Sequence, residues 1–189
     1  MRLQKLHIIL LGAMTFLSCK QSEESLFNQA VALDKSGKYR DAINTYSQVL
    51  KRNPKNEMAL YNRAICWYEL DSNKRALDDL TLLIDTKPNT GFESRTNPLW
   101  DKSNNRWAVF TSEAVFQRGV ILYNIDSLKK AFSDFSACVQ NGNEQGESYL
   151  YMGSIMVMYG KKDKACEYYR LALSYGSAKA MDFVSKGCP

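Results

Sequence analysis

Histidine is almost absent from this sequence of 189 residues, and the single copy is His7. Histidine is the commonest general base and the commonest neutral metal ligand, and Ser-His and Cys-His nucleophile pairs depend on it. The motifs G-x-G-x-x-G and G-x-S-x-G are missing too, and Gly37-Lys38 and Gly160-Lys161 lack the serine or threonine of a P-loop. The sequence therefore predicts a non-enzymatic protein with no cofactor and no metal site. Catalysis by carboxylates or lysines stays open.

The sequence also lacks a large excess of either charge, and its composition is not of low complexity. There are 25 basic and 20 acidic residues, and the resulting net charge of +5 is too small to predict nucleic-acid binding. Proline occurs only four times and hydrophobic residues make up 45% of the chain, so the composition is globular rather than disordered. The length predicts one domain, or two small ones, with a sizeable core.

The chain has no hydrophobic run long enough to cross a bilayer near its N-terminus. The run from Ile8 to Leu17 has about ten residues, whereas a membrane-spanning helix needs about 20. It follows Arg2 and Lys5, and this combination predicts a secretory signal peptide over residues 1–18. An uncleaved N-terminal anchor is the alternative interpretation.

The run ends in Phe16-Leu17-Ser18-Cys19, which resembles the lipobox of bacterial lipoproteins. Phe16 replaces the usual leucine, and Leu17 replaces the usual small residue. The resemblance implies cleavage after Ser18 and acyl chains such as palmitate on Cys19, which anchor a protein because each buried methylene contributes about 0.8 kcal/mol. It implies a lipid-anchored protein of the bacterial cell envelope, in the outer membrane, with residues 19–23 as a tether. Periplasmic and surface exposure both stay open.

A spacing of 34 residues recurs along the rest of the chain. It separates the members of five pairs: Ala30 and Ala64, Ala42 and Ala76, Pro54 and Pro88, Gly119 and Gly153, and Ala131 and Ala165. Apolar residues near these positions recur at spacings of three and four, which is typical of amphipathic helices. This pattern resembles the tetratricopeptide repeat family, in which each repeat is a helix-turn-helix unit.

The resemblance implies an all-α solenoid of about four helix-turn-helix repeats. Two repeats fall in residues 24–90 and two in residues 112–177, with residues 178–189 as a capping helix. Small residues such as Ala30 and Gly153 are expected where paired helices cross closely, because a large side chain would force the helices apart. An irregular helical bundle is the alternative fold.

The register breaks once, at an insert over residues 91–111. It contains Trp100 and Trp107, two of the three tryptophans of the chain, together with Arg95 and Arg106. Tryptophan and arginine are enriched at binding hot spots, so the insert is a candidate binding segment. The alternative is that both tryptophans pack back on the solenoid.

The resemblance also implies a binding face, because the first helices of tetratricopeptide repeats line the concave side. The candidate partner-binding residues are Phe27, Tyr61, Tyr68, Phe116 and Tyr123, together with Trp100 and Trp107 in the insert. Such an aromatic surface suits binding of a peptide or a helix. The other interpretation is that several of these aromatic residues belong to the hydrophobic core. Phe27 and Val31 stand where a Lys/Asn clamp for C-terminal carboxylates would need lysine and asparagine. The implied function is a scaffold or assembly factor that binds a protein or peptide, and the alternative is a glycan- or small-ligand-binding accessory lipoprotein.

The cysteines beyond the candidate lipidation site lie too far apart for a C-x-x-C motif. Cys166 and Cys188 each lie eleven residues from Ser177, the expected turn, so antiparallel helices would place them opposite each other. The spacing predicts a disulfide, which an exported compartment permits. Cys66 and Cys138 fall on apolar helix faces and are predicted to be small core residues.

Overall fold

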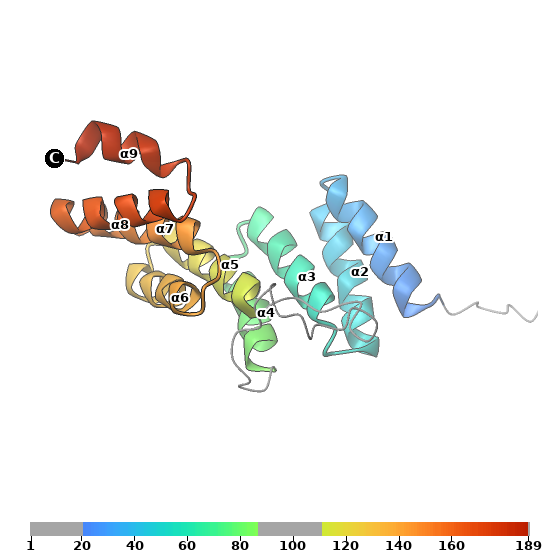
Figure 1. Cartoon of the computed structure of the whole chain (residues 1–189). Coiled ribbons are helices and arrows are strands. Elements are labelled where there is room, and N and C mark those ends of the chain that lie inside the picture. The colour runs from blue at the N-terminus through green and yellow to red at the C-terminus, as the bar shows by residue number, and fades with distance from the viewer. Residues whose placement is uncertain (1–20, 87–110, 189) are drawn as a thin grey trace, which may run out of the picture.

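The computed structural model describes residues 21–86 and 111–188. Within these residues the chain forms helices and no strands (Figure 1): α1 (Glu23–Lys35), α2 (Tyr39–Arg52), α3 (Glu57–Glu69), α4 (Asn73–Asp85), α5 (Thr111–Asn124), α6 (Leu128–Gln140), α7 (Gln145–Met158), α8 (Lys162–Ser174) and α9 (Ala180–Gly187). Eight of them form four helix pairs, and α9 follows the last pair. The predicted all-α fold of helix pairs is confirmed.

Each pair is closed by a short turn that contains one residue with a positive φ. These residues are Gly37 (72°), Asp71 (55°), Asp126 (57°) and Gly160 (70°). Glycine takes this left-handed conformation without strain, and aspartate tolerates it better than most residues. In the first turn the Lys38 N–H donates to the Leu33 carbonyl at 2.9 Å, and the other three turns make the matching bond. The chain therefore reverses in the same way at every pair.

The predicted small residues lie where paired helices cross. A Cβ added to Gly119 would lie 2.9 Å from Cε1 of Phe135, and one added to Gly153 would lie 2.6 Å from Cε1 of Tyr169. The alanines at the matching positions of the first two pairs are fully buried. These glycines and alanines thus let an aromatic or aliphatic side chain of the second helix fill the space beside the first helix.

Two hydrophobic clusters follow one another along the solenoid, and α5 belongs to both. Ala114 and Ile121 of α5 pack with the cluster of α1 to α4, whereas Leu122 packs with the cluster of α6 to α9. Leu77 of α4 is half-buried and touches both clusters. The core is therefore a continuous layer between neighbouring helices rather than one central body.

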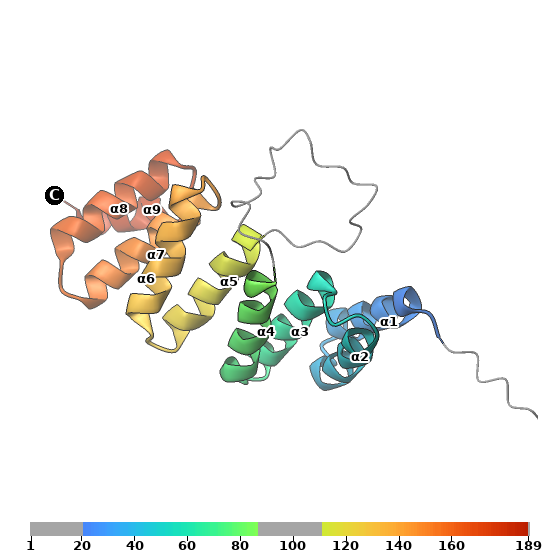
Figure 2. The same cartoon turned by 90° about the horizontal axis from the view of Figure 1, so that it is seen from below.

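The pairs lie side by side along a curved path, so α1 and α9 lie at opposite ends of an elongated molecule (Figures 1 and 2). The second helix of each pair packs against the first helix of the next pair. Among the described residues, no helix has both the length and the apolar character needed to cross a membrane.

Bidentate ion pairs join the helices within the second and third pairs. Nε and the terminal nitrogen Nη2 of Arg63 donate to the two carboxylate oxygens of Asp79, each at 2.7 Å. Arg118 and Asp134 repeat this arrangement at 2.8 Å. Arg63 also donates to Ser47 of α2, so its guanidinium connects the second pair to the first. Sequence reasoning missed these contacts, although the 16-residue spacing from arginine to aspartate occurs twice.

Two helices begin at or beside boundaries expected from sequence. The helix α1 begins at Glu23, one residue before the expected start of the first repeat, because Ser22 caps it by accepting a hydrogen bond from the Ser25 N–H at 3.1 Å. Thr111, expected at the end of the insert, is the first residue of α5. The expected signal peptide over residues 1–18, Cys19 and residues 91–110 lie outside the described residues.

Candidate partner-binding site

The first helices of successive pairs meet through aromatic side chains. The side-chain amide of Asn124 on α5 donates to the hydroxyl of Tyr68 on α3 at 2.5 Å. The ring centroids of Tyr123 on α5 and Tyr151 on α7 lie 5.2 Å apart in an edge-to-face contact. Such contacts fix the orientation of aromatic rings. The Tyr68 hydroxyl therefore joins α3 to α5 through Asn124, and aromatic rings join α5 to α7.

Tyr151 of α7 contacts three aromatic rings, those of Phe116, Tyr123 and Phe135. Its ring centroid lies 6.0 Å from that of Phe116, and it stacks on Phe135 at 4.8 Å. Burial raises the pKa of the Tyr151 hydroxyl above its ordinary value, so the group remains a neutral hydrogen-bonding hydroxyl at physiological pH. Sequence reasoning missed Tyr151 because the 34-residue spacing leads from Phe116 to its neighbour Leu150, and Leu150 is buried.

We call five half-buried side chains on these helices the aromatic strip: Tyr61, Tyr68, Phe116, Tyr123 and Tyr151. Four of them are candidates named from sequence, and Tyr151 is the addition. Partial exposure leaves part of each ring open to a partner, while ring contacts hold Phe116, Tyr123 and Tyr151 in fixed positions.

Phe27 does not belong to the aromatic strip. It is only 4% exposed, and its ring centroid lies 5.8 Å from that of Tyr46 in the second helix of its own pair. The prediction that Phe27 contacts a partner is wrong, because the ring faces α2 and fills the core of the first pair.

The first helices of the four pairs are acidic, whereas the second helices are basic. The helices α1, α3, α5 and α7 carry seven aspartates and glutamates against three lysines and arginines. Two of those three cations, Arg63 and Arg118, are held by aspartates of second helices. The helices α2, α4, α6 and α8 carry ten basic against seven acidic residues. The layer that presents the aromatic strip therefore has the opposite charge to the chain as a whole.

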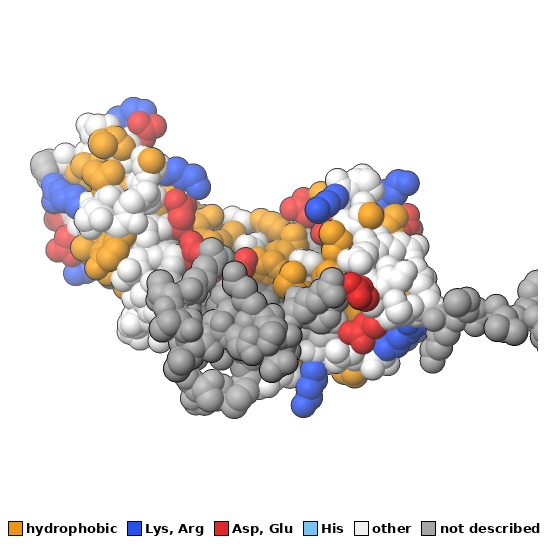
Figure 3. Space-filling model, turned by 45° about the vertical axis from the view of Figure 1, so that its right-hand side comes forward, with side chains coloured by type: hydrophobic (Ala, Val, Ile, Leu, Met, Phe, Trp, Pro, Cys, Tyr) orange, Lys and Arg blue, Asp and Glu red, His pale blue; other side chains and the backbone are white. Residues whose placement is uncertain are grey.

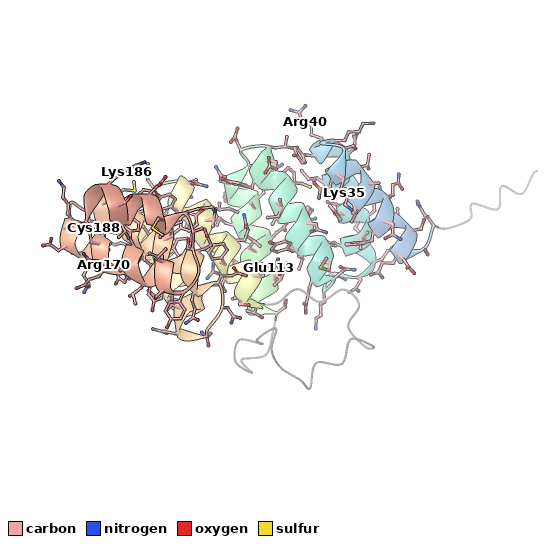
Figure 4. The ribbon with its side chains drawn as sticks, turned by 45° about the horizontal axis from the view of Figure 1, so that its top comes forward. Lys35, Arg40, Glu113, Arg170, Lys186 and Cys188 are labelled. Atoms are coloured by element: carbon pink, nitrogen blue, oxygen red, sulfur yellow. A yellow bond between two sulfur atoms is a disulfide. The ribbon has the colours of Figure 1, made fainter. Side chains whose placement is uncertain are left out.

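The molecular surface also brings hydrophobic and acidic side chains close together (Figure 3). A hollow lies between two raised ends of the molecule, with hydrophobic side chains on its floor and acidic side chains near it (Figure 3). Figure 4 shows Glu113 of α5 near the middle of the molecule, whereas the labelled cations lie toward the two ends: Lys35, Arg40, Arg170 and Lys186. Apolar and acidic groups together can bind apolar and basic groups of a partner.

The described residues contain no group of histidine, cysteine and carboxylate side chains arranged to hold a metal ion. The two free thiols, Cys66 and Cys138, are fully buried. Burial raises the pKa of each thiol to about 12, so neither forms the thiolate that nucleophilic chemistry needs. Their placement agrees with the expectation of small core residues.

The structure joins Cys166 of α8 to Cys188, just beyond α9, in a disulfide. This is the pair that the sequence spacing predicts. The disulfide holds the end of α9 against α8, and the Tyr169 and Phe183 rings stack between the same helices at 4.7 Å. Trp100, Trp107 and Cys19, the remaining candidates from sequence, lie outside the described residues.

Comparison with known proteins agrees with this architecture. Residues 27–89 match the family described as tetratricopeptide repeat. A stretch of 54 residues is 39% identical to Hsp70-Hsp90 organizing protein 2 of Arabidopsis thaliana, and it covers 29% of this chain and 10% of that protein. The chain thus spans about a tenth of the length of this relative.

Solved structures resemble the described helices over most of the chain. The crystal structure of MamA has a TM-score of 0.65 at 18% identity, covering 85% of this chain and 82% of that chain. A tetratricopeptide repeat protein from Parabacteroides merdae has a TM-score of 0.65 at 20% identity, covering 89% and 61%. The first tetratricopeptide repeat domain of Spaghetti (RPAP3), bound to the HSP90 peptide SRMEEVD, has a TM-score of 0.56 at 19% identity, covering 74% and 94%. The fold is that of a tetratricopeptide-repeat solenoid, and the comparisons support a tetratricopeptide-repeat protein.

Proposed function

We propose that this chain is a non-enzymatic scaffold that binds a protein or peptide partner along the aromatic strip. The observation that carries the proposal is that half-buried aromatic side chains lie on three first helices that are together acidic. The Asn124–Tyr68 hydrogen bond and the Tyr123–Tyr151 ring contact join these helices. Tyrosine and tryptophan offer large contact areas at low entropic cost, and charged groups around them select the partner by its sign.

The partner segment is apolar and basic. Aromatic or aliphatic side chains of the partner pack on the open parts of the strip, and its lysines or arginines meet the carboxylates of α3 and α5. The similar repeat domain that binds SRMEEVD is bound to a peptide with two adjacent glutamates. In this chain Phe27 is buried, and neither Phe27 nor Val31 can donate a hydrogen bond from its side chain to a carboxylate.

Selection from a displayed library of random short peptides tests this preference. We expect the peptides selected on the full chain to combine lysine or arginine with aromatic or aliphatic residues. Binding of SRMEEVD, measured by calorimetry, is expected to be undetectable at concentrations where the selected peptides saturate. Selection of acid-rich peptides, or tight binding of SRMEEVD, would contradict the proposed specificity.

Substitutions in the aromatic strip test whether the partner binds there. Tyr123→Ala and Tyr151→Ala should each weaken binding of a selected peptide about tenfold, since both rings connect neighbouring first helices. Tyr175→Ala is the control, because Tyr175 is an exposed tyrosine that follows α8 and lies outside the strip. Equal loss of binding in the strip variants and the control would show that the peptide binds elsewhere.

We further propose that the scaffold is tethered to the outer membrane of a bacterial envelope by acyl chains on Cys19. The lipobox-like sequence before Cys19 supports this. In cells fed labelled palmitate, the wild-type chain should take up label and a Cys19→Ser variant should not. Cys66→Ser is the control and should keep the label, and label on the Cys19→Ser variant would refute the anchor.

The tryptophan-containing insert is the second proposed contact. Crosslinked membranes that contain either the intact chain or a chain without residues 91–110 allow partners to be compared by mass spectrometry. This deletion leaves α5 whole, because α5 begins at Thr111. A partner lost with the insert would place recognition at Trp100 and Trp107, and a partner retained would place it on the aromatic strip.

A further inference from the structure

A cleft of about 730 Å³ lies at the C-terminal end of the molecule, where the end of α7 meets α8 and α9. Ala165, Tyr169 and the Cys166–Cys188 disulfide line it, and none of the residues of the aromatic strip does. The side chains of Val157 and Phe183 also line it and are 51% and 45% exposed. Small-molecule sites have volumes of about 300–1,000 Å³ and mostly apolar walls, so the cleft has the size and chemistry of such a site.

Cations outnumber acids around this cleft. Lys162, Lys179 and Lys186 line it together with the carboxylate of Asp182, and Lys179 also pairs with Glu147 of α7 at 3.2 Å. Lys186 and Asp182 are 3.7 Å apart, and both side chains are 77% exposed, so their mutual attraction is weak in water. Lys162 is the first residue of α8, where the positive end of the helix dipole adds to the potential. An anionic group is therefore favoured at this end of the cleft. Figure 4 shows Lys186 and Cys188 there.

The dimensions of the cleft restrict its occupant. The helix α9 has eight residues and is about 12 Å long at about 1.5 Å per residue, which is too short to support a long partner helix. A Cβ built on Gly187 would meet nothing within 4 Å, so space remains open along this wall. A slender apolar chain fits such a slot better than a segment of folded protein.

We propose that this cleft binds a single-chain anionic amphiphile, a molecule with one medium-length alkyl chain and a carboxylate head. The head group meets Lys162 and Lys186, and the alkyl chain lies along Tyr169 and Phe183. The disulfide keeps the two walls of the cleft together by fixing α9 against α8. This ligand site is separate from the aromatic strip and does not depend on peptide binding there.

Calorimetric titration of the full chain with dodecanoate, below its micelle concentration, tests the proposal. We expect one dodecanoate per chain. Dodecyltrimethylammonium, with the same alkyl chain and the opposite charge, should bind at least about tenfold more weakly because it meets lysines. Equal binding of the two amphiphiles, or binding of many molecules per chain, would overturn the proposal.

Substitutions distinguish this cleft from the rest of the surface. Gly187→Leu places a side chain in open space and should abolish dodecanoate binding while circular dichroism shows an intact fold. The double variant Lys162→Gln/Lys186→Gln should weaken binding about tenfold. Lys164→Gln is the matched control on α8, since Lys164 pairs with Glu167 and does not line the cleft.

Unchanged affinity in the Gly187→Leu chain would overturn the proposal, as would exclusive binding of an acid-rich peptide in place of dodecanoate. Peptide binding at the aromatic strip should be unaffected by all these variants.

Discussion

At the scale of single residues, the packing of this solenoid depends on a few positions where a side chain is either absent or paired. Gly119 and Gly153 give room to the rings of Phe135 and Tyr169. Asp79 and Asp134 are nearly buried carboxylates whose charges are balanced by arginines of the preceding helix. Both features join the two helices of one pair, so their removal should lower the free energy of unfolding.

Gly153→Ala should destabilise the protein by about 1–3 kcal/mol, because the new Cβ would lie 2.6 Å from the ring of Tyr169. The better helix propensity of alanine, about 1 kcal/mol, offsets part of this loss. Gly187→Ala is the matched control, since no atom lies within 4 Å of its added Cβ. Thermal unfolding followed by circular dichroism measures both. Equal melting temperatures for the two variants would mean that Tyr169 moves aside freely.

Asp79→Asn should lower the free energy of unfolding by about 2–4 kcal/mol, because it leaves the Arg63 guanidinium without its charge partner in a mostly buried place. Asp182→Asn removes the acid of an exposed pair and should change stability by less than about 0.5 kcal/mol. Urea unfolding curves provide the comparison. A similar small effect of both substitutions would show that the Arg63 pair is no more stabilising than a surface pair.

At the scale of elements, α9 is the described helix with the fewest neighbouring helices to pack against. It is the shortest, and it packs mainly against α8. Besides the disulfide, its contacts include the buried Ala180 and the Phe183 ring on Tyr169. An end helix covers the apolar face of the last repeat, which has no further neighbour.

Cys188→Ser should increase backbone hydrogen exchange in α9 and leave exchange in α1 to α6 unchanged. The disulfide spans 22 residues, and loss of such a crosslink costs up to about 3 kcal/mol in the chain-entropy account. A reducing agent should reproduce the change in the wild-type chain and have no effect on the Cys188→Ser chain. Protected α9 amides in the variant would show that packing alone holds the helix.

At the scale of the whole molecule, stability and charge are distributed along the solenoid. The two hydrophobic clusters share α5, so unfolding of one end exposes apolar surface of the other. The layer of first helices is acidic and the layer of second helices is basic, which gives the molecule two electrostatically different sides. The cluster of α1 to α4 also buries the free thiol of Cys66.

Alkaline pH should destabilise the whole molecule. Burial raises the pKa of Cys66 and of Cys138 from 9.0 to about 12, so the folded chain holds protons that the unfolded chain releases above about pH 9. This contribution to stability is complete below pH 9 and is lost as the pH rises toward 12, by up to about 1.4 kcal/mol per pH unit for each thiol. The urea midpoint should therefore fall between pH 8 and pH 10.5. In a Cys66→Ala/Cys138→Ala chain the urea midpoint should fall less steeply with pH. Identical slopes in the two chains would contradict the role given to these thiols.

The candidate site shows where sequence reasoning succeeded and where it failed. The 34-residue register located four of the five residues of the aromatic strip, because helix phase is set locally by residue spacing. It failed at Phe27 and at Tyr151, whose exposure depends on how far each helix rotates about its axis when it packs. That rotation is decided by contacts with other helices, such as the Phe27–Tyr46 and Tyr151–Phe135 contacts.

The sequence by itself determined the helix pairs, the close crossings at small residues and the spacing of Cys166 and Cys188, because each depends on local periodicity and chain length. Only the tertiary structure decided that Arg63 and Arg118 connect neighbouring pairs, that the first helices form one acidic layer, and that a cleft opens beside α9. These features arise where residues far apart in sequence are brought together by packing. A one-dimensional pattern contains no direct record of such distances.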